Sequence, residues 1–140
     1  MMKKLNNRGF TFVELLAVIT ILGILIATAT IAVSKHLENT RKQAMETIAS
    51  SSYDAAVIYL MDNNIMLNSG EKKSLTIEQL YQEDRIERPS DPYNDGNMCS
   101  GQVIVTNNTN NSTTGLEDYK YQVYVNCSGN HKVEQQYPKR

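Results

Sequence analysis

One apolar run near the start of the chain constrains the fold more than any other feature. It covers residues 10–33, a stretch of 24 residues whose only charged side chain is Glu14. A helix of this length spans roughly 36 Å, which exceeds the ~30 Å hydrocarbon core of a bilayer. No proline interrupts the run. The sequence therefore predicts a membrane-spanning helix.

The charges before the run predict its orientation. Lys3, Lys4 and Arg8 precede it, so the positive-inside rule places the N-terminus in the cytoplasm and the rest of the chain outside. A secretory signal peptide is the alternative, because the residues Ala-Thr-Ala at positions 27–29 resemble a small-residue cleavage site. Such peptides have apolar regions of about 7–15 residues, whereas this run is longer and contains a carboxylate.

Glu14 is the unusual residue of the run. A carboxylate at membrane depth costs about 2.5–3.5 kcal/mol on insertion scales, so it normally has a partner or a function. One interpretation places Glu14 near the cytoplasmic headgroups, where water solvates it. The other requires a cation in the same shallow layer, and a free α-amino group made by a cut just before Phe10 would supply one.

The residues around Glu14 form a specific pattern. They read GFTFVELL over positions 9–16, after a short basic leader and before the apolar run. This pattern resembles the class III signal of type IV pilins and pseudopilins. The resemblance implies that a membrane peptidase cuts between Gly9 and Phe10 and methylates the new N-terminal Phe10. It also implies that Glu14 pairs with the amino terminus of a neighbouring subunit during filament assembly, so that neither charge is buried alone.

One departure from the family concerns proline. Many pilins from double-membraned bacteria have a helix-kinking proline in this segment, whereas this chain has none before Pro89. A locally melted helix in the filament is therefore not expected.

The residues after the run predict a second, amphipathic half of the same helix. Residues 34–64 contain neither proline nor glycine. Their apolar stripe has its centre at Leu37, Ala44, Ile48, Ala55 and Tyr59, and it is widened by Met45, Ala49 and Ala56. We interpret the stripe as core rather than a coiled-coil seam, because sustained heptads are absent. The expected division is a leader (1–9), a transmembrane helix (10–33), its amphipathic half (34–64) and an extracytoplasmic head (65–140).

A second helix is predicted to begin after Thr76. Thr76 and Gln79 have the spacing of a capping box, and Leu75 with Leu80 supplies a hydrophobic staple. This helix should end before Pro89, since the residue that precedes a proline disfavours the helical conformation.

The turn that follows offers a candidate metal site. Residues 89–96 read PSDPYNDG, and their Asp91 and Asp95 carboxylates are candidate calcium ligands. The segment fails the EF-hand pattern at other positions, which favours a plain turn. Its Asp-Pro-aromatic-Asn sequence nevertheless resembles a turn in the major pseudopilins of type II secretion, some of which bind calcium.

Cys99 and Cys127 lie in two runs of alternating apolar residues. An antiparallel register that sets Cys99 opposite Cys127 also pairs other apolar residues, namely Val103 with Val123 and Val105 with Tyr121. All of these side chains then share one face of a hairpin. Facing cysteines in an exported hairpin are expected to form a disulfide, worth about 2–4 kcal/mol. Two reduced core thiols are the alternative. In type IV pilins a disulfide near the C-terminus similarly bounds a variable surface region.

The remaining composition excludes several classes of protein. The net charge of −1 argues against a generic nucleic-acid binder, which would be strongly basic. Two cysteines and two histidines are too few for a zinc site made from those residues alone. No residues stand in a recognisable catalytic pattern, so we expect neither an enzyme nor a cofactor. The polar tail over residues 131–140 is expected to be solvated.

The expected fold class is therefore α+β, with a long N-terminal helix packed on a small antiparallel sheet. The resemblance implies a structural subunit of a type IV pilus or a pilus-like pseudopilus, including those of competence and type II secretion. Its partners would be a prepilin peptidase/N-methylase, other pilin subunits, an inner-membrane assembly platform and the membrane, with DNA binding left open. It would be stored in the cell membrane and assembled into a surface filament. The alternative is a single-pass, membrane-anchored binding protein that acts without assembly.

Overall fold

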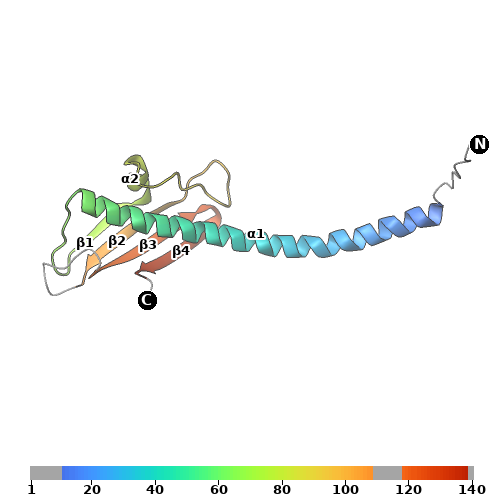
Figure 1. Ribbon diagram of the computed structural model, residues 1–140, viewed down its shortest axis with the longest axis horizontal. Helices are drawn as coiled ribbons and strands as arrows, with labels where there is room; N and C mark the ends of the chain where they lie inside the picture. The colour runs from blue at the N-terminus through green and yellow to red at the C-terminus, as the bar shows by residue number, and fades with distance from the viewer. Residues whose placement is uncertain (1–10, 109–117, 139–140) are drawn as a thin grey trace, which may run out of the picture. The chain divides into compact units, whose positions relative to one another are not determined.

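The computed structural model describes residues 11–108 and 118–138. Its element order is α1 (Phe12–Asp62), β1 (Lys72–Thr76), α2 (Ile77–Gln82), β2 (Ser100–Asn107), β3 (Tyr119–Cys127), η2 (Ser128–Asn130) and β4 (His131–Tyr137) (Figure 1). The chain divides into an N-terminal unit that ends at Asn39 and a C-terminal unit that begins at Thr40. The predicted α+β class, a long N-terminal helix packed on a small antiparallel sheet, is confirmed.

The described part of the N-terminal unit is the first part of α1. Its most apolar stretch has a mean hydropathy of 2.6 and is long enough to cross a membrane, and none of that stretch is buried in the structure. Hydroxyl groups in this part of the helix donate to backbone carbonyls of the preceding turn, as in Thr20 to Ala17, Thr28 to Leu25 and Thr30 to Ile26. Each of these hydroxyls therefore has an acceptor inside the helix and does not require water.

The second part of α1 packs on the sheet through small and apolar side chains. The most buried line follows helical spacing and consists of Met45, Ala49, Ser52, Ala56 and Leu60. The buried line therefore runs along one edge of the predicted stripe. Ala55 and the three residues predicted to widen the stripe are buried, whereas Ile48 and Tyr59 are half-buried and Leu37 is exposed. Both stripes are apolar, but the line of small residues lets the helix backbone lie closer to the sheet. The Ser52 hydroxyl donates to the Ile48 carbonyl at 2.7 Å, which satisfies this buried polar group.

The sheet has four antiparallel strands in the order β1-β2-β3-β4, and α1 crosses one of its faces (Figure 1). The predicted register of β2 on β3 is confirmed, with Val103 opposite Val123 and Val105 opposite Tyr121. These four side chains are buried. Because side chains alternate along a strand, the intervening Ile104 and Gln122 point to the other face.

The expectation of a solvated tail is wrong for His131–Tyr137, because this segment forms β4 and pairs with β3. Its inward-facing positions are partly or fully buried, while Lys132, Glu134 and Gln136 are exposed. Tyr137 is buried and stacks on Tyr53 of α1, with ring centroids 4.6 Å apart. Lys139 and Arg140, the last residues of the predicted tail, lie outside the described residues.

The start of α2 follows the prediction. The Thr76 hydroxyl accepts a hydrogen bond from the Gln79 backbone N–H at 3.1 Å, which satisfies one of the amides left free at a helix start. Leu75 and Leu80, the predicted staple, are both buried. The helix ends at Gln82, before Pro89. The capping residue is also the last residue of β1, so strand and helix meet without a loop.

Gly101 shows how closely β2 and β3 approach each other. A Cβ atom added at Gly101 would lie 2.0 Å from the Tyr124 carbonyl oxygen and 2.9 Å from Ile77 of α2. The obstructing oxygen belongs to the backbone, so it cannot rotate away as a side chain would.

We therefore expect Gly101→Ala to destabilise the C-terminal unit by about 2 kcal/mol or more, because the strands must separate to admit the methyl group. Chemical denaturation of the full-length chain in detergent, followed by circular dichroism, measures the change. Ser100→Ala, at the exposed preceding position of β2, is the matched control. A Gly101→Ala protein as stable as this control would contradict the prediction.

Candidate functional site

The N-terminal candidate residues fall on both sides of the first described position. Gly9 and Phe10, the predicted processing residues, lie outside the described residues. Glu14 lies in the first turn of α1. The structure therefore describes the predicted assembly residue and the helix start that follows the predicted cut.

Thr11 and Glu14 form a reciprocal cap at the start of α1. The Thr11 backbone N–H donates to Glu14 Oε2 at 2.9 Å, and the Glu14 backbone N–H donates to Thr11 Oγ1 at 3.3 Å. The Thr11 hydroxyl is also 3.1 Å from Glu14 Oε2. This is a capping box, which satisfies two amides that have no partner within the helix. The Thr-x-x-Glu spacing at positions 11–14 carries this signal in the sequence, but we assigned Glu14 no capping role from it.

The capping box sets the electrostatics of Glu14 within a single chain. Its carboxylate lies at the N-terminal end of the helix dipole, where negative charge is favoured. It also accepts a hydrogen bond from the Thr11 backbone N–H. The carboxylate is thus held at the N-terminal end of α1, near the start of the apolar run.

The side chains after this cap are apolar and uncovered. Phe12 is 79% exposed and Ile24 is 67% exposed. Such a continuous apolar surface is unusual for a soluble protein and marks a segment that contacts lipid or protein. The chemistry of this segment is therefore one capped carboxylate followed by an apolar helix surface.

Residues 4–30 match the family model for the prokaryotic N-terminal methylation motif. This motif is the class III signal of type IV pilins and pseudopilins, and the match includes Gly9, Phe10 and Glu14. The resemblance stated from the sequence is thus confirmed, and the chain carries a prepilin-type signal. A signal of this kind, followed by an apolar helix, points to a structural subunit anchored in the membrane. Neither the curated proteins nor the solved structures contain a significant match to the chain.

The second candidate region lies around the two cysteines. Cys99 and Cys127 form a disulfide across the start of β2 and the end of β3, with Cα atoms 4.4 Å apart. Both residues are buried. The disulfide expected from their shared face is therefore present, and reduced core thiols are not.

Hydrogen bonds to the Asp91 carboxylate connect the turn before β2 to the turn after β3. Asp91 is only 3% exposed. One carboxylate oxygen accepts from the Tyr93 backbone N–H at 2.8 Å, and the other accepts from the Ser128 backbone N–H at 2.8 Å. Burial by itself raises the pKa of Asp91, but hydrogen bonds, first from Ser128 and then from amides of its own turn, outweigh it and hold the pKa below its ordinary value.

The structure gives the two candidate calcium ligands different surroundings. Both Asp91 oxygens accept backbone hydrogen bonds, whereas Asp95 is exposed. Within the part of the chain that the structure describes, the Asp91 carboxylate lies within 4.8 Å of the sulfurs of Cys99 and Cys127, and Asp95 is not part of this cluster. The two sulfurs of that cluster are bonded to each other and offer no thiolate to a metal.

An aromatic stack joins the same turn to α1 and β4. The Tyr93 ring stacks on the His131 ring with centroids 3.6 Å apart and planes within 4°. The Arg41 guanidinium of α1 lies 5.3 Å from the Tyr93 centroid, within range of a cation–π interaction. The sequence does not predict that Tyr93 stacks on His131. The stack depends on β4, and the polar sequence of that segment does not indicate a strand.

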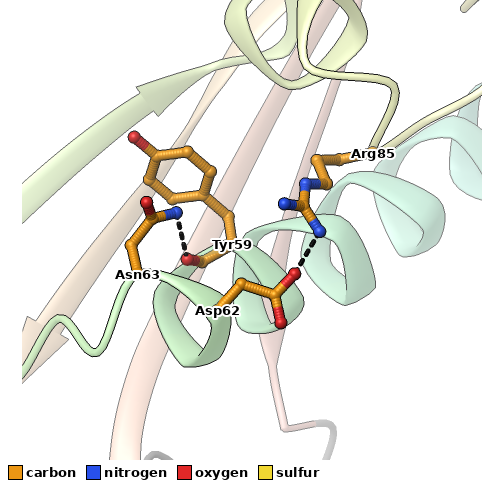
Figure 2. Close-up of polar contacts among 4 residues, drawn as sticks. All are labelled: Tyr59, Asp62, Asn63 and Arg85. Carbon is orange, nitrogen blue, oxygen red and sulfur yellow. Dashed lines mark hydrogen bonds and ion pairs between the residues drawn. The ribbon is translucent and has the colours of Figure 1, made fainter.

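Polar contacts also fix the end of α1 (Figure 2). Arg85, which follows α2, forms an ion pair with Asp62, the last residue of α1. The Tyr59 carbonyl accepts from both the side-chain amide of Asn63, at 2.9 Å, and its backbone N–H, at 3.2 Å. A groove of about 390 Å³ lies beside these contacts, between α1 and the segment 85–89.

We expect Asp91→Asn to destabilise the C-terminal unit by about 2 kcal/mol near neutral pH, since the amide –NH2 would face one of the two N–H donors. The folded pKa of Asp91 is lower than its unfolded value. Its contribution is therefore present above about pH 4 and is lost as the pH falls through the folded pKa.

Thermal unfolding of wild type and Asp91→Asn at neutral and acidic pH tests this expectation, with exposed Asp95→Asn as the control. The difference between wild type and Asp91→Asn should shrink in acid. A difference of equal size at both pH values would contradict the role of the charge.

Proposed function

We propose that the chain is a prepilin, the membrane-stored precursor of a subunit of a type IV pilus or a related pseudopilus. The observation that carries the proposal is the methylation motif over residues 4–30, together with an apolar surface of α1 that none of the described residues buries. A signal of this kind directs processing and assembly, and the uncovered surface provides an apolar face for assembly.

The proposed division of the chain follows from that role. Residues 1–9 are a leader removed by a prepilin peptidase, which cuts after Gly9 and methylates Phe10. Residues 10–33 cross the membrane before assembly and form the filament core afterwards, and residues 34–64 continue the helix. The basic leader keeps the N-terminus in the cytoplasm. Residues 65–140 form the head outside, where an oxidising compartment suits the disulfide.

Glu14 is the proposed assembly residue. Its carboxylate is satisfied within the single chain by Thr11, which lowers the cost of holding it near the membrane before assembly. In the filament it would instead pair with the methylated amino terminus of a neighbouring subunit. An incorrectly placed subunit would leave that amine unpaired in an apolar layer, which is costly. The other partners are an inner-membrane assembly platform and further pilin subunits.

The mass of the mature N-terminus tests the processing step. In cells with a prepilin peptidase, we expect mass spectrometry to find a chain that begins at Phe10 and carries one added methyl group. Expression of the same gene without the peptidase is the control and should yield the uncut chain. An intact leader in peptidase-competent cells would refute the proposal.

Glu14→Ala tests the assembly step. We expect it to leave the C-terminal unit folded but to abolish incorporation into filaments, measured by shearing cells and quantifying the released subunit. Thr11→Ala is the matched variant, because it weakens the capping box but keeps the carboxylate. We expect it to retain much more assembly than Glu14→Ala. Normal filaments with Glu14→Ala, or equal losses in both variants, would show that pairing by the carboxylate is not the determinant.

The groove between α1 and residues 85–89 supports a second candidate, a membrane-anchored binding protein that acts without assembly. This candidate requires the mature chain to remain monomeric in the membrane. Cross-linking in cells separates the two functions, since a filament subunit yields a ladder of multimers and a monomeric receptor does not.

A further inference from the structure

The Asp91 carboxylate lies beside both sulfurs of the disulfide. One of its oxygens and the Sγ atoms of Cys99 and Cys127 all lie within 4.8 Å of one another, and all three residues are buried. The carboxylate therefore lies where negative charge must develop if the disulfide opens. We propose that Asp91 protects the Cys99–Cys127 disulfide from reduction by thiols.

The chemistry of reduction explains why a nearby carboxylate matters. A reducing thiolate attacks one cysteine sulfur and forms a mixed disulfide with it, while the electron pair of the broken Cys99–Cys127 bond leaves on the other sulfur as a thiolate. That thiolate then takes a proton from solvent. With a dithiol reductant, the second thiol displaces the first cysteine from the mixed disulfide. Two electrons pass to the protein, and the reductant becomes a cyclic disulfide.

Both charged sulfurs of this reaction must lie near Asp91. The attacking thiolate approaches a negative carboxylate, and the leaving thiolate forms next to it. Like charges repel strongly at this separation where water is excluded, and a neighbouring negative charge disfavours the thiolate form of a cysteine. Burial of all three residues adds a steric barrier to attack. The carboxylate thus raises the barrier to both the attack and the departure.

The surrounding hydrogen bonds keep the charge in place. Tyr93 donates to one carboxylate oxygen and Ser128 to the other, both through backbone N–H groups at 2.8 Å. Ser128 directly follows Cys127 in the chain, so the same contact positions the carboxylate relative to the disulfide. A carboxylate held from both sides cannot rotate away as a reductant approaches.

The test compares reduction rates of full-length chains in detergent micelles. Wild type, Asp91→Asn and Asp91→Glu are treated with dithiothreitol, quenched by alkylation and followed by mass spectrometry. Asp91→Asn removes the charge, while Asp91→Glu keeps it and disturbs the same hydrogen bonds. We expect Asp91→Asn to be reduced about tenfold faster than wild type or more. Asp91→Glu should stay within about threefold of wild type.

Two results would overturn the proposal. If Asp91→Asn is reduced at the wild-type rate, the charge offers no protection. If Asp91→Asn and Asp91→Glu are equally fast, loosening of the turn rather than the charge controls access. The three rates should also coincide in concentrated guanidinium chloride, where the carboxylate no longer faces the disulfide, and a difference that persists there would equally refute the idea.

A measurement on the wild-type chain does not depend on how the variants fold. After reduction, the rate of alkylation as a function of pH reports the pKa values of the two thiols. We expect at least one thiol to have a pKa above the ordinary value of about 8.5, because its thiolate forms beside the carboxylate. Two thiols with ordinary or lowered pKa values would contradict the proposal.

Discussion

The described residues of the chain bury none of the most apolar stretch of α1, and this constraint governs how the protein is built. Exposed apolar area costs about 25 cal/mol per Å² in water, so the helix needs an apolar environment from outside. A bilayer and a bundle of identical helices are the two environments that the proposed function requires. Both exclude water, and both therefore require the helix to satisfy its own polar groups.

The polar groups at the start of α1 meet that requirement internally. Thr11 and Glu14 satisfy one another at the first turn, and hydroxyls such as that of Thr20 donate to the preceding turn. The hydroxyl-to-carbonyl bonds travel with the helix, so a passage from lipid into a filament leaves them intact. On the proposed passage, only the partner of the Glu14 carboxylate changes. One charge can therefore distinguish a correctly placed subunit from an incorrectly placed one.

Sequence periodicity predicted the elements that bury several apolar residues. It missed β4, which buries few. The register of β2 on β3 was predictable because Val103 and Val105 of β2 and Tyr121 and Val123 of β3 are spaced by two, and a shift by one position would turn them away from the core. β4 has one aliphatic residue, Val133, among polar ones. Its place in the sheet depends on contacts from distant segments, such as the stack of Tyr137 on Tyr53. Asp91 was seen as a turn residue, but its bond to Ser128 joins residues far apart in sequence, and no local pattern contains it.

The β2–β3 hairpin is held at both ends, and this determines which part of the chain can vary. At one end the disulfide and Asp91 fix the start of β2 to the end of β3. At the other end Asn107 lies opposite Tyr119, and both side chains contact the backbone of Leu67. The Asn107 side-chain amide donates to the Leu67 carbonyl at 2.8 Å, and the Leu67 N–H donates to the Tyr119 hydroxyl at 2.9 Å. The contacts described for both anchors are made by residues outside positions 109–117. Because lengthening a loop adds little closure entropy, residues 109–117 can change in number and kind while the register, and with it the core against α1, stays the same.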